Sequence, residues 1–185
     1  MGSIEPWKEY PEIWKTQAAF MSWVRGGIRG GLWKKHPVKL EFLKENVVLV
    51  PNTNPRSMKR FPMVKAARCA LCKRVTPQKD VEVDHLTGNH SLRSMDDLRA
   101  FIEAMIMVTK EDLQLVCKPC HKVKSYAEKQ GISFELAQAT KEAIVLQKGK
   151  ADTAWLLKAG LVPATSAPKR REQIIQHMMK EDVWC

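Results

Sequence analysis

Residues 113–121 have the sequence LQLVCKPCH. The apolar run at 113–116 is typical of a short buried strand, and it leads directly into the pair Cys117 and Cys120. His121 follows at once, and a helical pattern then continues to a glycine at position 131, a common helix stop. The stretch therefore predicts a strand, two metal-binding thiols and the start of a helix in direct succession.

A second cysteine pair, Cys69 and Cys72, has the same spacing, and 44 residues separate it from the first pair. Two residues between ligands allow a tight turn to direct both sulfurs at one ion, so the pairs supply the four thiolates of a tetrahedral zinc site. Such a closed site has no open coordination position, which predicts a structural Zn2+ rather than a reaction centre. Buried free cysteines and a thioredoxin-like redox pair are the alternatives, although redox chemistry needs only one such pair.

An acid and a histidine stand at the end of a second predicted strand. Val81 and Val83 flank a glutamate in an alternating pattern, and Asp84 and His85 follow them. A histidine with a pKa near neutrality can take a proton from water. A carboxylate and an imidazole suit ions such as Mg2+, Mn2+, Zn2+ or Ni2+, and they leave positions open for water. An Asp-His pair alone is common. Here the two cysteine pairs, and His121 directly after Cys120, favour a functional site.

Taken together, the pair Cys69 and Cys72, the dipeptide Asp84-His85 and the stretch 112–125 resemble the zinc-stapled HNH endonucleases common in bacteriophages and prophages. The resemblance covers residues 69–125. It implies an α+β fold with a ββα-metal core, in which two antiparallel strands and a helix hold one divalent cation against the scissile phosphate.

The same resemblance implies the roles of the site residues. His85 is expected to be the general base that activates water, while Asp84 and His121 ligate a catalytic cation that stabilises the leaving 3′ oxygen. One position departs from the family pattern, because Asp112 stands where the family has the asparagine that orients the base histidine. We expect Asp112 to hold the imidazole by a side-chain hydrogen bond, with a backbone carbonyl as the alternative.

The sequence predicts three regions. Residues 1–60 form a basic, tryptophan-rich helical N-terminal region, residues 61–131 form the HNH core with its zinc site, and residues 132–185 form a helical C-terminal extension. A first helix is expected over 11–25, interrupted by the glycine pairs that follow it, and the proline- and asparagine-rich segment 51–55 predicts a turn or linker. Further helices are expected at about 94–107, from about 133 to 149, at about 153–159 and from 168 onward.

The formal net charge of +11 and the sequence pI near 9.6 favour polyanionic partners, because binding them releases counterions. Most of the excess lies in residues 1–68, which carry 13 basic and 5 acidic side chains. We expect contacts with DNA phosphates from eight basic residues, namely Arg25, Arg29, Lys59, Arg60, Lys65, Arg68, Lys122 and Lys124. The alternative role for the glycine–arginine segment 25–31 is that of a flexible turn. The alternative for Lys122 and Lys124 is that they are exposed to solvent without contacting DNA.

The composition, 44% hydrophobic and 28% charged, is that of an ordinary globular protein. No stretch approaches the roughly 18 apolar residues that would suggest a membrane span. The first residues lack the basic and apolar parts of a secretory signal, so we expect a cytoplasmic setting, that of the host cell if a phage encodes the chain.

The main hypothesis is a metal-dependent DNA endonuclease that acts in phage DNA processing or homing. A module with one active centre nicks one strand at a time, so double-strand cleavage would need a homodimer or two successive events. The alternatives are a noncatalytic zinc-containing DNA-binding adaptor and a phage interaction protein that binds a host factor.

Overall fold

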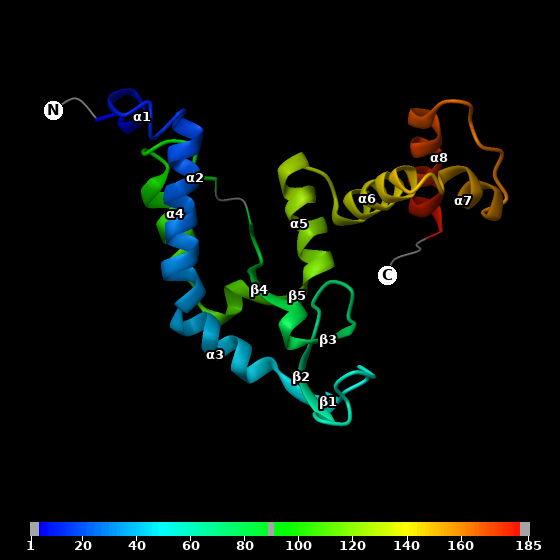
Figure 1. Cartoon of the computed structure of the whole chain (residues 1–185), viewed down its shortest axis with the longest axis horizontal. Helices are drawn as coiled ribbons and strands as arrows, with labels where there is room; N and C mark the ends of the chain where they lie inside the picture. The colour runs from blue at the N-terminus through cyan, green and yellow to red at the C-terminus, as the bar shows by residue number, and fades with distance from the viewer. Residues whose placement is uncertain (1–3, 89–90, 182–185) are drawn as a thin grey trace. The chain divides into compact units, whose positions relative to one another are not determined.

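The computed structural model describes residues 4–88 and 91–181 and shows a mixed α+β protein with small sheets (Figure 1). The predicted α+β class is confirmed. None of the helices within these ranges is long and apolar enough to cross a membrane. The chain divides into two compact units, the first made of Met1–Arg68 and Val75–Leu115, the second of Cys69–Arg74 and Val116–Cys185.

Helices form the N-terminal part of the first unit. In chain order they are α1 (Pro6–Glu9), α2 (Gln17–Gly27), a π-helical turn (Ile28–Leu32), a 3₁₀ turn (Trp33–Lys35) and α3 (Pro37–Asn46). Helix α2 starts later than predicted, because the Thr16 hydroxyl accepts a hydrogen bond of 3.1 Å from the Ala19 N–H and caps the helix there. The predicted interruption at the glycine pairs is wrong, since the backbone stays helical through Gly27 and then widens into the π-helical turn.

Three antiparallel strands follow in the order β1-β2-β3, and they are β1 (Val48–Pro51), β2 (Met63–Arg68) and β3 (Val75–Pro77). In the register of β1 and β2, Val48 lies opposite Ala66, and Pro51 lies opposite Met63. Of the two predicted alternatives for segment 51–55, the structure has the turn, because the segment begins a hairpin loop that spans residues 52–62.

A second, two-stranded sheet pairs β4 (Val81–His85) with β5 (Leu113–Cys117), close to the predicted bounds of both strands. The Leu86 N–H donates a hydrogen bond of 2.8 Å to the Asp112 carbonyl. This bond joins the end of β4 to the start of β5, so the two strands run in opposite directions. After Leu115 the chain of β5 passes from the first unit into the second.

Two apolar clusters fill the first unit. One lies around the strands and contains Ala67, Val81, Val83, Leu113 and Leu115. The other joins α2 to α4 (Leu98–Ile106), which run side by side in Figure 1, and contains Met21, Leu92, Phe101 and Met105. The indole ring of Trp33 packs against both clusters. Because side chains alternate along a strand, burial of Val81 and Val83 leaves Asp84 on the other face of β4.

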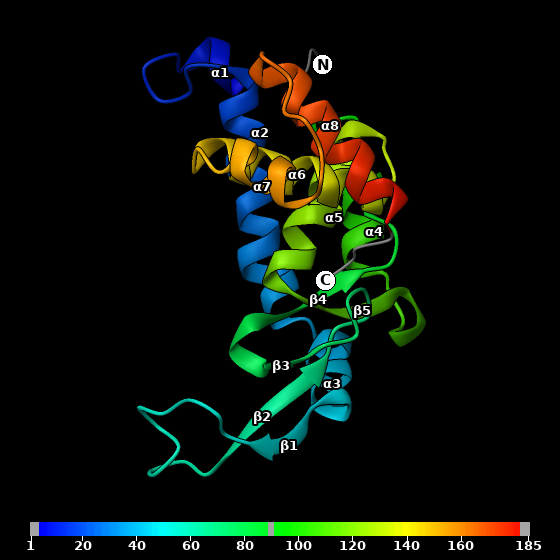
Figure 2. The ribbon, with the colours of Figure 1, turned by 90° about the vertical axis from the view of Figure 1, so that its right-hand side faces the viewer.

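The second unit is helical apart from the end of β5, and its helices are α5 (Lys118–Gln130), α6 (Phe134–Lys148), α7 (Asp152–Lys158) and α8 (Ala167–Lys180). Their predicted positions are confirmed. Gly131 ends α5 with a φ of 64°, and the Ser133 hydroxyl caps α6 by accepting a hydrogen bond of 3.1 Å from the Leu136 N–H. Small side chains, Ala139 and Ala143, allow α6 to pack closely against α7 and α8 (Figure 2).

Candidate metal centre and catalytic residues

The four predicted zinc ligands meet in the second unit. The Sγ atoms of Cys69, Cys72, Cys117 and Cys120 all lie within 4.8 Å of one another, and none of these residues forms a disulfide. Tetrahedral zinc with bonds of about 2.3 Å places its sulfurs about 3.8 Å apart. The distance between the Cys72 and Cys117 sulfurs is 3.8 Å. The cluster can therefore hold an ion such as zinc in tetrahedral coordination, as predicted. Because four cysteines lie together, a redox pair of two cysteines is disfavoured.

Backbone hydrogen bonds shape the first cysteine pair and join it to the second. The Cys69 N–H donates to the Arg74 carbonyl at 2.9 Å, and Lys73 closes the turn with a left-handed φ of 61°. The Cys117 N–H donates to the Cys69 sulfur at 3.3 Å, which joins the two pairs. Three of the cysteines are buried, and Leu71, Val116 and Phe134 cover them.

The protonation of the thiols differs across the cluster. Burial opposes ionisation of Cys72, but hydrogen bonds from the backbone and side chain of Arg74 lower the pKa of its thiol to about 6. Burial raises the pKa of Cys117, and burial with the neighbouring thiols raises that of Cys120. A metal ion must therefore displace protons from Cys117 and Cys120 when it binds.

Asp84 and His85 lie at the end of β4 in the first unit, both half-buried. The buried side chain of Gln114, on β5, donates from Nε2 to Asp84 Oδ2 and to the His85 carbonyl, each at 3.4 Å. Gln114 was not among the predicted site residues. Its position between two apolar residues of a predicted strand is the signal that points to a buried polar group with a partner.

The imidazole of His85 stacks on Trp33, with ring centroids 4.3 Å apart and an angle of 29° between the planes. Trp33 stands where the π-helical turn passes into the 3₁₀ turn. The Lys39 ammonium lies 4.9 Å from the centroid of the Trp33 ring, and burial lowers the pKa of this lysine. Trp33 was not among the predicted site residues, and no local signal in the sequence points to its contact with the predicted base.

Asp112 uses its carboxylate as a cap. Its Oδ2 accepts hydrogen bonds from the Thr109 N–H at 2.7 Å and the Thr109 hydroxyl at 2.9 Å, which closes the 3₁₀ turn Lys110–Asp112. These bonds hold the pKa of Asp112 below its ordinary value, and the nearby His85 acts in the same direction. The carboxylate thus has a structural partner, while its predicted role in orienting His85 stays a prediction.

His121 belongs to the second unit, where it follows Cys120 on the first turns of α5 and is half-buried. The other predicted catalytic residues, Asp84, His85 and Asp112, belong to the first unit. The structure thus brings three of the four together within one unit, and the fourth is fixed beside the cysteine cluster by its place in the chain.

The predicted DNA-binding residues fall into three groups. Four are exposed on or beside the β1–β2 hairpin, namely Lys59, Arg60, Lys65 and Arg68. Arg25 and Arg29 lie on α2 and the π-helical turn, where burial and the charge of Arg25 lower the pKa of Arg29. On α5, Lys122 is exposed, whereas Lys124 forms an ion pair of 2.5 Å with Glu128.

Comparisons of the chain with protein-family models, with curated proteins and with solved structures find no match. The resemblance to HNH endonucleases therefore stays a prediction from the sequence motifs.

Proposed function

We propose that the chain is a metal-dependent DNA endonuclease of the HNH class, which hydrolyses phosphodiester bonds. One observation carries the proposal. Asp84 and His85 end a strand, Gln114 of the paired strand holds them, and that strand runs straight into the cysteine cluster and His121. The chain order of β4, β5 and α5 is the order of a ββα-metal module, which supports our proposal of a ββα-metal core.

Asp84 offers a half-buried carboxylate, a ligand type that suits Mg2+, Mn2+, Zn2+ or Ni2+. His121, a half-buried imidazole of the second unit, is proposed as a further ligand on the strength of the family resemblance alone. When bound, such an ion supplies Lewis-acid stabilisation of the charge on the leaving 3′ oxygen. The four thiolates are a separate, closed donor set, for which we propose a structural Zn2+.

His85 is the proposed general base. Its imidazole accepts a proton from water as the water oxygen bonds to phosphorus and the bond from phosphorus to the 3′ oxygen breaks. The stack on Trp33 and the hydrogen bond from Gln114 to the His85 carbonyl fix the ring and the backbone that carries it. Such fixing places the base before the substrate arrives, which is how positioning lowers a barrier.

Basic residues of the first unit are proposed to hold the DNA backbone, with Lys122 of α5 as a further contact. We propose phage DNA processing or homing as the setting of this activity. A single centre nicks one strand, so double-strand cleavage requires a homodimer or two successive events.

A plasmid-nicking assay tests the proposal. With Mg2+ or Mn2+ the wild type should convert supercoiled plasmid into the nicked form, and His85→Ala and Asp84→Asn should lose about a hundredfold or more of that rate. His177→Ala is the matched control, because His177 also lies beside a tryptophan, 5.6 Å from Trp155, but outside the proposed site. Equal cutting by all of these proteins would mean that a contaminating nuclease cuts the plasmid, and it would refute the proposed nuclease activity. DNA binding without cutting would favour the noncatalytic adaptor.

A further inference from the structure

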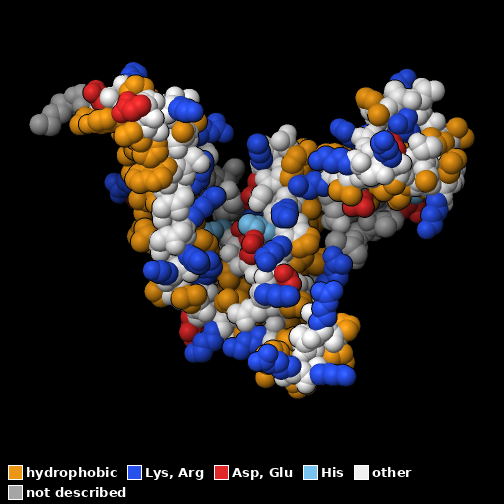
Figure 3. Space-filling view, viewed as in Figure 1, with side chains coloured by type: hydrophobic (Ala, Val, Ile, Leu, Met, Phe, Trp, Pro, Cys, Tyr) orange, Lys and Arg blue, Asp and Glu red, His pale blue; other side chains and the backbone are white. Residues whose placement is uncertain are grey.

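The β1–β2 hairpin carries positive charge over a stretch that has no acidic residue. Between Glu45 and Asp80 the chain has eight lysines and arginines and no aspartate or glutamate. Those that belong to the first unit are all exposed, and they are Arg56, Lys59, Arg60, Lys65, Arg68 and Lys79. Figure 3 shows Lys and Arg side chains gathered over this end of the unit. Such a surface attracts a polyanion.

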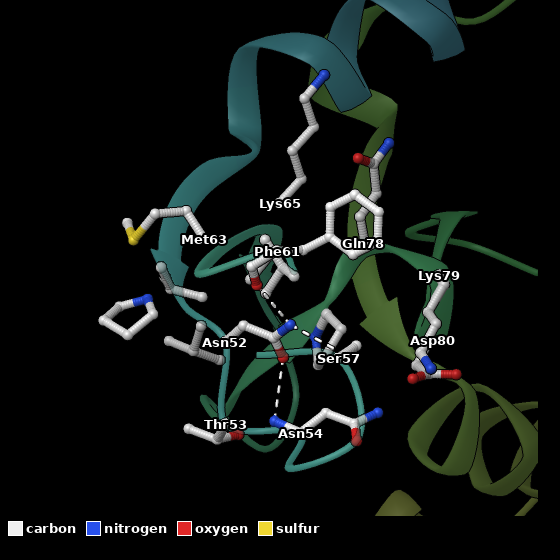
Figure 4. A pocket seen from close by; sticks show the side chains of 16 residues that line it. Asn52, Thr53, Asn54, Ser57, Phe61, Met63, Lys65, Gln78, Lys79 and Asp80 are labelled. Atoms are coloured by element: carbon white, nitrogen blue, oxygen red, sulfur yellow. Dashed lines mark hydrogen bonds between the residues drawn. The ribbon is translucent and has the colours of Figure 1, made fainter. Parts of the chain in front are cut away.

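Asn52 holds the hairpin loop in a defined shape. Its buried amide donates to the Phe61 carbonyl at 2.7 Å and to the Ser57 hydroxyl at 3.1 Å, and its Oδ1 accepts from the Asn54 N–H at 3.0 Å (Figure 4). The Asn54 side chain in turn accepts from the Arg56 N–H at 3.0 Å. A loop that is already ordered has less conformational entropy to lose when a ligand binds.

A pocket of about 720 Å³ lies beside this loop. Strand β3 and the 3₁₀ turn that follows it, Gln78–Asp80, form its other side. Its volume falls within the range of about 300 to 1,000 Å³ that is usual for ligand pockets. Besides apolar residues, its walls contain amides, ammonium groups and one aromatic ring (Figure 4). The polar and aromatic residues of its walls include Asn54, Phe61, Lys65, Gln78, Lys79 and Asp80.

These groups match the parts of a nucleotide. The Phe61 side chain is 52% exposed, and the Arg60 guanidinium lies 5.2 Å from its ring centroid, so a base can stack on the ring beside a cation. The amides of Asn54 and Gln78 can donate to and accept from a base edge. Asp80 can accept from a base amino group, and the lysines can contact phosphate oxygens.

We propose that this pocket binds one unpaired nucleotide of a DNA strand, so that the protein prefers DNA with a single-stranded segment to a fully paired duplex. A base within a duplex is covered by its stacked neighbours and enters a pocket only after it is flipped out of the helix. Flipping costs unpairing and unstacking energy, and an unpaired base avoids this cost. The inference rests on the proposed function for the identity of the polyanion as DNA, but it requires no hydrolysis.

Fluorescence anisotropy of the full chain, without added Mg2+ or Mn2+, tests the preference with a labelled single-stranded oligodeoxynucleotide and the duplex of the same sequence. The single strand should bind more tightly. Phe61→Ala should weaken its binding about tenfold, whereas Phe61→Trp should retain it, because the stacking surface is lost in one variant and kept in the other. Tyr10→Ala is the matched control, since Tyr10 is an equally exposed aromatic residue of the same unit, at 54%.

A strand that contains 2-aminopurine reports on the base itself. Its fluorescence should change on binding to the wild type and Phe61→Trp, and not on binding to Phe61→Ala. Equal affinity for duplex and single strand would overturn the proposal that the pocket binds an unpaired nucleotide. So would a Phe61→Ala protein with the same affinity and the same 2-aminopurine response as the wild type. Tighter binding of the matching oligoribonucleotide would overturn the assignment to DNA. Phe61-dependent binding without plasmid nicking would leave the pocket standing and refute only the nuclease.

Discussion

The indole ring of Trp33 stacks on the imidazole ring of His85, with 4.3 Å between their centroids. The two residues are far apart in the sequence, and the tryptophan also packs against both apolar clusters of the first unit. The position of the proposed base is thus coupled to the packing of that unit, and Trp33 acts as a positioning residue in the proposed reaction.

Replacement of Trp33 should therefore affect both stability and the proposed activity. Trp33→Ala should lower the free energy of unfolding by about 3 kcal/mol. It should also reduce kcat for plasmid nicking about tenfold, with little change in KM, because the base is less well placed. Trp33→Phe keeps a ring that can stack and should recover most of kcat.

Trp23→Ala serves as the control, because Trp23 is 63% exposed and lies outside the contact with His85. Chemical denaturation and steady-state nicking measure the two effects separately. A Trp33→Ala protein with unaltered kcat would refute the positioning role.

A second prediction concerns the cysteine cluster. The wild type should bind one zinc ion per chain, and Cys120→Ser should bind none and should unfold more readily, because the metal contributes folding free energy. Elemental analysis and the thiolate absorbance of the Co2+-loaded protein measure occupancy. Cys185→Ser is the control, since Cys185 lies outside the described residues and the predicted cluster. Full occupancy in Cys120→Ser would refute a four-thiolate site.

Acid should release this metal. The pKa values of Cys117 and Cys120 lie above the ordinary value in the metal-free cluster, so both thiols are protonated at neutral pH and metal binding displaces their protons. Zinc affinity should therefore fall as the pH falls. Competition with a chromogenic chelator at several pH values measures this, and a pH-independent affinity would contradict the thiolate assignment.

Local signals in the sequence were sufficient for the second unit. The spacing of the cysteine pairs, the left-handed glycine at 131 and the capping serine at 133 each act within a few residues, and the structure has the cluster and helices where they predict them. The contacts of His85 could not be predicted in this way. The stack with Trp33 and the bond from Gln114 depend on which distant segments pack together, which a short window of sequence does not specify.

The hairpin loop shows the same limit. Its prolines and asparagines are typical of either a turn or a linker, and they do not show that the Asn52 side chain closes the loop between two paired strands. Asn52→Ala should lower the free energy of unfolding by about 1 to 3 kcal/mol, because buried partners lose their hydrogen bonds. It should also speed hydrogen exchange of the Asn54 amide. Asn46→Ala is the control, since Asn46 makes one exposed bond to the Phe42 carbonyl, and an equal effect in both would refute the special role of Asn52.

The turn between α7 and α8 depends on an ion pair. The Arg170 Nε lies 2.7 Å from the buried Asp152 Oδ2, and the same guanidinium donates to the carbonyls of Ala164 at 3.1 Å and Thr165 at 2.9 Å. Arg170 thus stabilises the fold of the second unit. Asp152→Asn should destabilise this unit by about 1 to 3 kcal/mol at neutral pH, because a charged hydrogen bond is replaced by a neutral one.

The pH dependence of this effect has a definite sign. The hydrogen bond from Arg170 holds the pKa of Asp152 below its ordinary value in the folded protein. The ion pair therefore contributes its full stability above the unfolded pKa of about 3.9, and this contribution is lost as the pH falls through the lower folded pKa. Thermal melts from neutral to acidic pH should show the gap between wild type and Asp152→Asn closing on the acid side. Glu172→Gln, an exposed change on α8, should show no such gap. A gap that stays constant down to the most acidic melt would mean that the asparagine acts through packing rather than through loss of the charge.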